Sequence, residues 1–123
     1  MPPRMKAALA GCAPKPRLTE RSLLTLPQAA ELAGMFKVLA NDTRLRLLHA
    51  LVRAGELSVT ELADALGMKP QAVSNQLQRL ADRGILGCQR NGNSMHYRLE
   101  DPCVTALLDH GLCFVEDARG RRR

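Results

Sequence analysis

Two cysteines, Cys103 and Cys113, lie ten positions apart in the stretch DPCVTALLDHGLC near the end of the chain. Thiolates are soft ligands and select soft metal ions. The stretch has the apolar spacing of a helix, in which ten residues rise about 15 Å. A thiolate lies only about 2.3 Å from a bound zinc-like ion. The two thiols of one chain therefore cannot hold the same ion.

Further donors could complete a site. Cys12, near the start of the chain, could supply a third thiolate, and His110, three residues before Cys113, could supply a nitrogen to zinc or cadmium. The alternative interpretation is that Cys103 and Cys113 are packing residues and that Cys12 has no role. The remaining candidates are expected to be structural: Cys88, His49 and His96.

The composition indicates one small helical domain. The chain has 123 residues, 46% of them hydrophobic, with only two phenylalanines and one tyrosine. A core built mainly from leucine, alanine and valine favours packed helices over a β-sandwich. No apolar run reaches the roughly 18 residues that span a bilayer, and the start of the chain does not resemble a signal peptide. We expect a cytoplasmic protein with reduced cysteines.

Charge divides the chain into three parts. Residues 1–22 are basic and contain four of the seven prolines, which predicts a flexible arm. Residues 23–118 should form the folded domain, and residues 119–123 a basic tail. The formal net charge is +6, and within the domain residues 69–98 hold five basic side chains against one acidic one. This local basic surface favours a polyanionic partner.

Caps and apolar periodicity predict five helices. The expected boundaries are a start near Pro27, a second helix capped by Asp42 and ended by Gly55, a third from the capping box Ser58–Glu61 to Gly67, a fourth from Pro70 to Gly84, and a last one from about Pro102.

The third and fourth helices, joined by a tight glycine turn, predict a helix-turn-helix. After them, Asn91-Gly92 predicts a β-hairpin turn between two strand-like segments. The expected fold is therefore mainly α with a small β-hairpin wing (α+β), a winged helix-turn-helix. Amides and a hydroxyl on one face of the fourth helix can read base edges, and nearby basic residues can meet phosphates. The predicted DNA-binding residues are Lys69, Gln71, Ser74, Asn75, Gln78, Arg79, Arg90 and Arg98.

Three segments, FKVLANDTRLRLLHAL, ELSVTELADALGMKPQAVSNQLQRLADRGIL and GNSMHYRL, together resemble the ArsR/SmtB family of bacterial metal-responsive repressors. The resemblance covers most of the chain outside its two ends. It implies a homodimer, with the first and last helices at the interface, that binds a palindromic operator in double-stranded DNA. It also implies that an inducer releases the operator.

The resemblance also implies inducer sites that can be compared with this sequence. One family site has cysteines in a pattern like ELCVCDL, but the matching stretch ELSVTEL carries Ser58 and Thr60. A zinc site of the family lies on the last helix. There, Asp101 matches the family aspartate, Cys103 replaces a histidine, and Phe114 stands where a ligand is needed. Neither site is present in its usual form.

In an antiparallel two-fold dimer, Cys103 of one subunit would approach Cys113 of the other, twice over. The prediction is thus a repressor that releases DNA when a thiophilic ion binds at the interface. Two thiolates satisfy Hg(II), which is favoured, whereas As(III) needs three; Cd(II) is a further candidate and Zn(II) a weaker one.

Other functions remain as alternatives. The same thiols could respond to oxidation or persulfidation without metal. A remote alternative is an interaction module that has lost DNA binding. No phosphate loop, carboxylate pair or nucleophile motif supports an enzyme.

Overall fold

The computed structural model describes residues 15–121. Its elements form two compact units, residues up to Glu100 and a last helix after it, which are described separately. In chain order the elements are η1 (Leu18–Glu20), α2 (Leu26–Leu39), α3 (Asp42–Ala54), β1 (Leu57–Ser58), α4 (Val59–Leu66), α5 (Pro70–Asp82), β2 (Leu86–Asn91), β3 (Ser94–Leu99) and α6 (Pro102–Arg121). The predicted fold class is confirmed. Cys12 lies outside the described residues.

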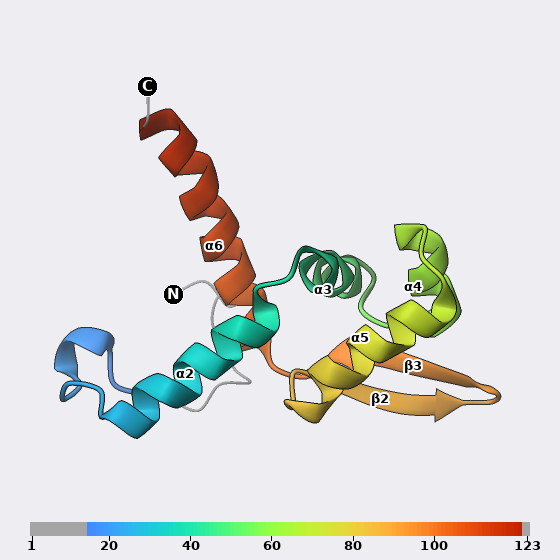
Figure 1. Cartoon of the computed structure of the whole chain (residues 1–123), viewed down its shortest axis with the longest axis horizontal. Helices are drawn as coiled ribbons and strands as arrows, with labels where there is room; N and C mark the ends of the chain where they lie inside the picture. The colour runs from blue at the N-terminus through green and yellow to red at the C-terminus, as the bar shows by residue number, and fades with distance from the viewer. Residues whose placement is uncertain (1–14, 122–123) are drawn as a thin grey trace, which may run out of the picture. The chain divides into compact units, whose positions relative to one another are not determined.

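The core of the first unit is built from leucines, as the composition predicts. Helices α3, α4 and α5 lie beside the β2–β3 hairpin (Figure 1). Seven side chains are almost completely buried between these elements: Leu47, Leu48, Leu51, Leu62, Val73, Leu77 and Leu80. Tyr97 of β3 closes this core with only 5% of its surface exposed. Burial of this apolar surface holds α5 and the hairpin in one unit.

The sheet has three antiparallel strands in the order β1-β3-β2. Strand β1 pairs Leu57 with Tyr97 and Ser58 with His96. The sequence predicted only the hairpin, because a strand of two residues carries no alternating pattern that can be recognised. Strand β1 joins the start of α4 to the wing.

The hairpin turn lies one residue later than predicted. Asn91 and Ser94 are paired, so the two connecting residues are Gly92 and Asn93 rather than Asn91 and Gly92. Gly92 has φ +69°, and in the described residues only glycines have positive φ. A turn with its required glycine at the first central position explains the shift.

Helix α3 also begins differently. Its cap is Asn41, whose side chain accepts a hydrogen bond from the Arg44 amide at 3.0 Å, and Asp42 is the first helical residue. Both types are good caps, and the extended backbone of Asn41 decides between them. A short helical turn, η1, lies within the predicted arm, and α6 continues to Arg121 within the predicted tail.

Candidate DNA interface and thiol site

The turn between α4 and α5 fixes the direction of α5. Gly67 ends α4 in the left-handed conformation, with φ +67°, which glycine adopts without steric cost. The Met68 amide donates to the Ala63 carbonyl at 3.0 Å. Pro70 then opens α5, where its missing N–H costs no hydrogen bond. The predicted helix-turn-helix geometry is therefore present.

Helix α5 has one buried face and one polar face. Val73, Leu77 and Leu80 are buried, whereas the amides of the predicted contact residues are exposed. Gln71 donates to Asn75 at 3.1 Å, so these two amides form one hydrogen-bonded pair. Such a pair presents further donors and acceptors outward, which is what reading a base edge needs.

The other predicted contact residues of α5 surround this pair. Lys69 is the residue that caps α5, and Ser74 is half-buried. Gln78 donates to Asp82 at 2.8 Å, which restrains its amide one turn further along. Arg79 is exposed at the last turn. These side chains extend the polar face along the whole helix.

The wing carries two basic side chains in different environments. Arg90 is exposed on β2, next to the turn. Arg98 is half-buried on β3 and lies 3.4 Å from the Glu100 carboxylate. Arg90 therefore has the freer side chain for a phosphate. The partly exposed ion pair of Arg98 is weak, so a phosphate can replace Glu100 as its partner.

Ser58, Glu61 and His96 meet where the wing joins α4. The Ser58 hydroxyl accepts from the Glu61 amide at 3.1 Å, and the Glu61 carboxylate accepts from the Ser58 amide at 2.8 Å. These bonds from Ser58, with a smaller contribution from His96, lower the pKa of Glu61. His96 also lies 3.4 Å from Glu56. The sequence predicted the capping box but gave no signal for the Glu56–His96 contact.

Tyr97 and Cys88 are paired across β2 and β3. Burial raises the pKa of the Tyr97 phenol, and the nearby Cys88 adds to the shift. Cys88 is an exposed free thiol on a sheet strand. Its predicted structural role stays a prediction.

Helix α6 carries both predicted thiol ligands. Its first turn is capped by Asp101, whose carboxylate accepts from the Cys103 amide at 2.8 Å. Cys113 is exposed, and its thiol donates to Asp117 one turn later at 3.7 Å. Because Cys103 and Cys113 belong to one helix, they are separated by about 15 Å along its axis.

The oxidation state of the two cysteines differs. Cys113 carries a free thiol, as expected, whereas Cys103 is disulfide-bonded, so the expectation of reduced cysteines was wrong for Cys103. A sulfur in a disulfide must be reduced before it can bind a metal ion as a thiolate. Any test of metal binding therefore needs reduced protein.

Helix α6 also carries His110, the remaining candidate ligand, and Phe114, which cannot bind a metal ion. His110 is exposed, and Phe114 lies 5.5 Å from the Arg121 guanidinium, a cation–π contact. Within residues 15–121 of this single chain, no group of three or more His, Cys, Asp or Glu side chains could hold a metal ion. The chemistry of the donors on α6 fits a soft ion, but one described helix does not complete a site.

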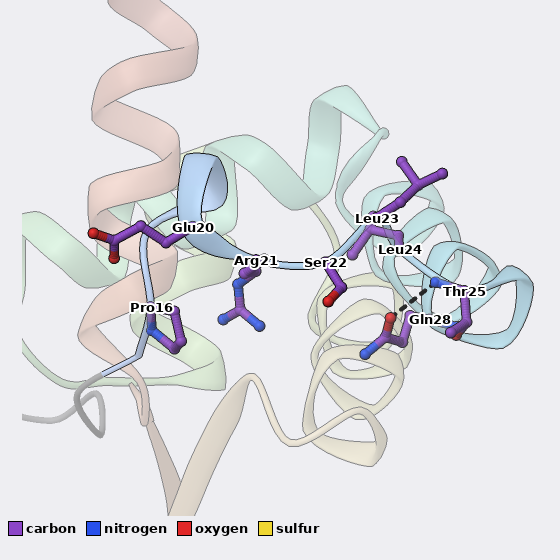
Figure 2. Close-up of a pocket in the computed structure, with 8 residues that line it drawn as sticks. All are labelled: Pro16, Glu20, Arg21, Ser22, Leu23, Leu24, Thr25 and Gln28. Atoms are coloured by element: carbon purple, nitrogen blue, oxygen red, sulfur yellow. Dashed lines mark hydrogen bonds between the residues drawn. The ribbon is translucent and has the colours of Figure 1, made fainter.

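A surface hollow of about 400 Å³ lies between η1 and the start of α2 (Figure 2). It is lined by Pro16, by the segment from Glu20 to Thr25 and by Gln28, whose side chain accepts a hydrogen bond from the Thr25 amide at 2.9 Å. Its one acidic residue, Glu20, is paired with Arg17 at 3.1 Å. With no thiol or imidazole in its lining, this hollow has no chemistry for a thiophilic ion.

The fold and the polar face of α5 define a winged helix-turn-helix protein, and comparison with known proteins identifies its family. A model described as "Helix-turn-helix domain" matches residues 39–89. The transcriptional regulator NmtR of Mycobacterium tuberculosis is 43% identical over 88 residues, which cover 72% of each chain.

Two solved structures are similar to this chain. The crystal structure of the antimony-specific transcriptional repressor AntR is 62% identical, with a TM-score of 0.75, and the match covers 89% of this chain and 98% of that one. A homodimeric winged helix-turn-helix domain of Mycobacterium bovis is 29% identical, with a TM-score of 0.66, over 79% of this chain and 92% of that one. Other relatives, at 28–42% identity, are named as arsenic, cadmium and mercury resistance regulators.

The chain belongs to the ArsR/SmtB family of metal-responsive transcriptional repressors. Proteins of this family are DNA-binding regulators rather than enzymes. In the described part of the chain, no helix is both long and apolar enough to span a membrane.

Proposed function

We propose that this protein is a cytoplasmic homodimer that binds an operator in double-stranded DNA and releases it when a thiophilic ion binds Cys103 and Cys113. Helix α5 reads the bases, and the wing contacts the backbone. The observation that carries the proposal is the location of both thiols on α6, a helix on which no residue is buried within the single chain. The inducer site then uses the same surface as the subunit interface.

The proposed DNA contacts are supported by the two different faces of α5, one apolar and one polar. Its apolar face is used in the core, and the hydrogen-bonded Gln71–Asn75 pair lies on the opposite face. Lys69, Arg79 and Arg90 are exposed cations available for phosphates. Ser74, Gln78 and Arg98 complete the proposed contact set. Base contacts set the specificity, and phosphate contacts set position and salt dependence.

The homodimer is supported by apolar side chains that the single chain leaves exposed. Helix α2 buries only Leu39 and exposes 45% of Phe36. Helix α6 buries none of its residues and exposes 58% of Leu112. Apolar faces of this kind mark interaction surfaces, and the M. bovis neighbour is described as homodimeric.

The thiol site follows from the geometry of α6 in such a dimer. Cys103 and Cys113 of one chain are too far apart to share an ion, but two antiparallel copies of α6 bring Cys103 of each subunit towards Cys113 of the other. Two symmetric sites result, each with one thiolate from each subunit. Cys12 is the proposed third thiolate, and His110 a weaker additional donor.

The choice of ion depends on the number of thiolates. Two thiolates satisfy Hg(II), which the sequence alone favours, while a trivalent metalloid needs three. The high identity to an antimony-specific repressor supports a three-thiolate site. We therefore rank As(III) and Sb(III) ahead of Hg(II), with Cd(II) next and Zn(II) last.

Release of DNA requires that the ion prefer one dimer geometry. An ion that joins the two copies of α6 favours one relative orientation of the two DNA-binding units. It weakens operator binding only to the extent that this orientation fits the operator less well. The protein's own residues transmit the effect through the packing of the dimer helices.

A second function, a thiol-redox repressor, is favoured by the disulfide at Cys103. Oxidation would then change the same interface without a metal ion. The two functions differ in one respect: the metal sensor responds in the presence of a phosphine reductant, and the redox sensor does not.

The test is operator binding by the reduced protein, followed by fluorescence anisotropy during titration with As(III), Sb(III), Hg(II), Cd(II) and Zn(II). We expect a thiophilic ion to release the wild type but neither Cys103→Ser nor Cys113→Ser. Equal release of the wild type and both variants would contradict the thiol site. Release by an oxidant alone, with no response to any ion, would favour the redox function.

A further inference from the structure

Helix α2 is attached to the DNA-binding elements by two arginines rather than by a large apolar contact. Only Leu39 of α2 is buried. Arg44 of α3 donates from Nη1 to the Val38 carbonyl at 2.9 Å, and Arg83 donates from Nη2 to the Gly34 carbonyl at 3.1 Å. Gly34 and Val38 are four residues apart, so both bonds reach the same face of α2.

Both attachments are suited to a guanidinium group. The Val38 carbonyl is among the last four of α2, which have no partner in an ideal helix, so Arg44 satisfies a group that would otherwise need water. Gly34 leaves room for Arg83, because a Cβ there would lie 3.2 Å from Nη2. A planar guanidinium can hold its donors in a fixed direction, which an ammonium group does not.

The same two arginines also reach the helix that we propose reads DNA. Arg44 donates from Nε to the Gln76 side chain at 2.8 Å, and Gln76 lies in the middle of α5. Arg83 is itself the residue that follows α5 and caps its end. These two points are seven residues apart, or about 10 Å along the axis of α5. Two separated attachments fix the direction of a helix, whereas one would let it pivot.

We propose that Arg44 and Arg83 are positioning residues that set the angle between α2 and α5, and so determine which spacing of operator half-sites the dimer accepts. The proposal rests on the proposed dimeric repressor, in which α2 lies at the interface. If α2 is fixed by the partner subunit, its angle to α5 sets the separation of the two copies of α5. We call Arg44, Arg83 and Gln76 the arginine clamp.

A matched control lies beside the clamp. Arg44, Arg79 and Arg83 line one hollow of about 240 Å³ together with Val38 and Asp82. The Arg79 side chain makes no hydrogen bond or ion pair within the described part of the chain. It thus shares the charge and location of the clamp without joining α2 to α5.

The experiment uses the DNA duplex that the wild type selects from a randomised library, and variants of it with one or two base pairs added or removed between the half-sites. Each base pair changes the separation of half-sites by about 3.4 Å and rotates them by about 35°. We expect the wild type to lose about tenfold or more in affinity for each change, because DNA or protein must deform to fit.

The clamp variants are Gln76→Met, which changes no charge, and Arg83→Met. We expect both to fold, as judged by circular dichroism and thermal unfolding, and to bind all spacings within about threefold of one another once the angle is no longer fixed. Arg79→Met should weaken binding equally at all spacings and reduce the salt dependence, as loss of a phosphate contact does.

The possible results distinguish an error in the clamp proposal from an error in the proposed function. If the folded Gln76→Met and Arg83→Met proteins keep the wild-type preference for one spacing, the clamp does not set the angle, whatever happens to their affinity. If the wild type binds no duplex, or binds as a monomer in sedimentation experiments, the proposed function itself is contradicted.

Discussion

Ser58 and Glu61 cap α4 reciprocally: each side chain accepts a hydrogen bond from the other residue's backbone amide, at 3.1 and 2.8 Å. Ser58 also pairs with His96 of β3. One residue therefore starts the first helix of the helix-turn-helix and joins it to the wing. The cap stands in the segment where other family members are expected to carry inducer cysteines, so here that segment has a structural role.

Replacement of this cap should destabilise the domain. We expect Ser58→Ala to lower the free energy of unfolding by about 1 kcal/mol, the usual cost of losing a serine cap. Chemical denaturation measures this change as a shift of the midpoint. Thr60→Ala, at an exposed position of the same turn, is the control and should change stability by no more than about 0.5 kcal/mol. Equal midpoints for Ser58→Ala and the wild type would show that the cap contributes nothing.

The same cap predicts a dependence on pH. The pKa of Glu61 is lower in the folded protein than the ordinary value of 4.5. The charged carboxylate thus adds stability above pH 4.5, and this stability is lost as the pH falls through the lower folded value. Glu61→Gln keeps a capping amide but does not titrate. The wild type should be more stable than this variant at pH 7, and the difference should shrink in acid; a constant difference would contradict the prediction.

Loss of a base contact and loss of a phosphate contact should change DNA binding in different ways. Asn75→Ala should weaken binding to the preferred duplex by about 1–3 kcal/mol and relax discrimination at one base position. Arg90→Ala should weaken all duplexes similarly and reduce the slope of log K against log salt by about 0.9. Binding measured on a panel of single-base substitutions at several salt concentrations distinguishes them. If Asn75→Ala lowered the affinity for all duplexes equally, Asn75 would not take part in base recognition.

Cys88 should not take part in the inducer response. It lies on β2 as an exposed free thiol paired with Tyr97. We expect Cys88→Ser to bind DNA and respond to ions with the wild-type midpoints in the anisotropy titration. A loss of response in this variant alone would place the sensor in the wing rather than on α6.

Much of the fold follows from local sequence signals. Ser58, Gly67 and Pro70 mark the ends of two helices through cap chemistry that acts within a few residues, so those boundaries were predictable. The cap of α3 was misassigned because Asn41 and Asp42 are both good caps and only the backbone conformation separates them. The hairpin turn was misplaced by one residue for a similar reason, since Gly92 can occupy either central position.

Features that join distant segments could not be predicted. The Arg44–Gln76 bond spans 32 residues, and the Glu56–His96 contact joins residues 40 apart. No periodicity or cap signal encodes such pairs. The arrangement of the thiol site is likewise not encoded in local sequence signals. Cys103 and Cys113 lie on one helix, but their proposed partners come from a second chain.

The central claim is that each inducer site takes one thiolate from each subunit, and mixed dimers test it most directly. A dimer with Cys103→Ser in one subunit and Cys113→Ser in the other, purified through two different tags and reduced, has one site with both α6 thiolates and one site with neither. We predict that this mixed dimer binds one equivalent of the most potent ion and releases DNA, while each homodimeric variant does neither. A mixed dimer as unresponsive as the two homodimeric variants would contradict it.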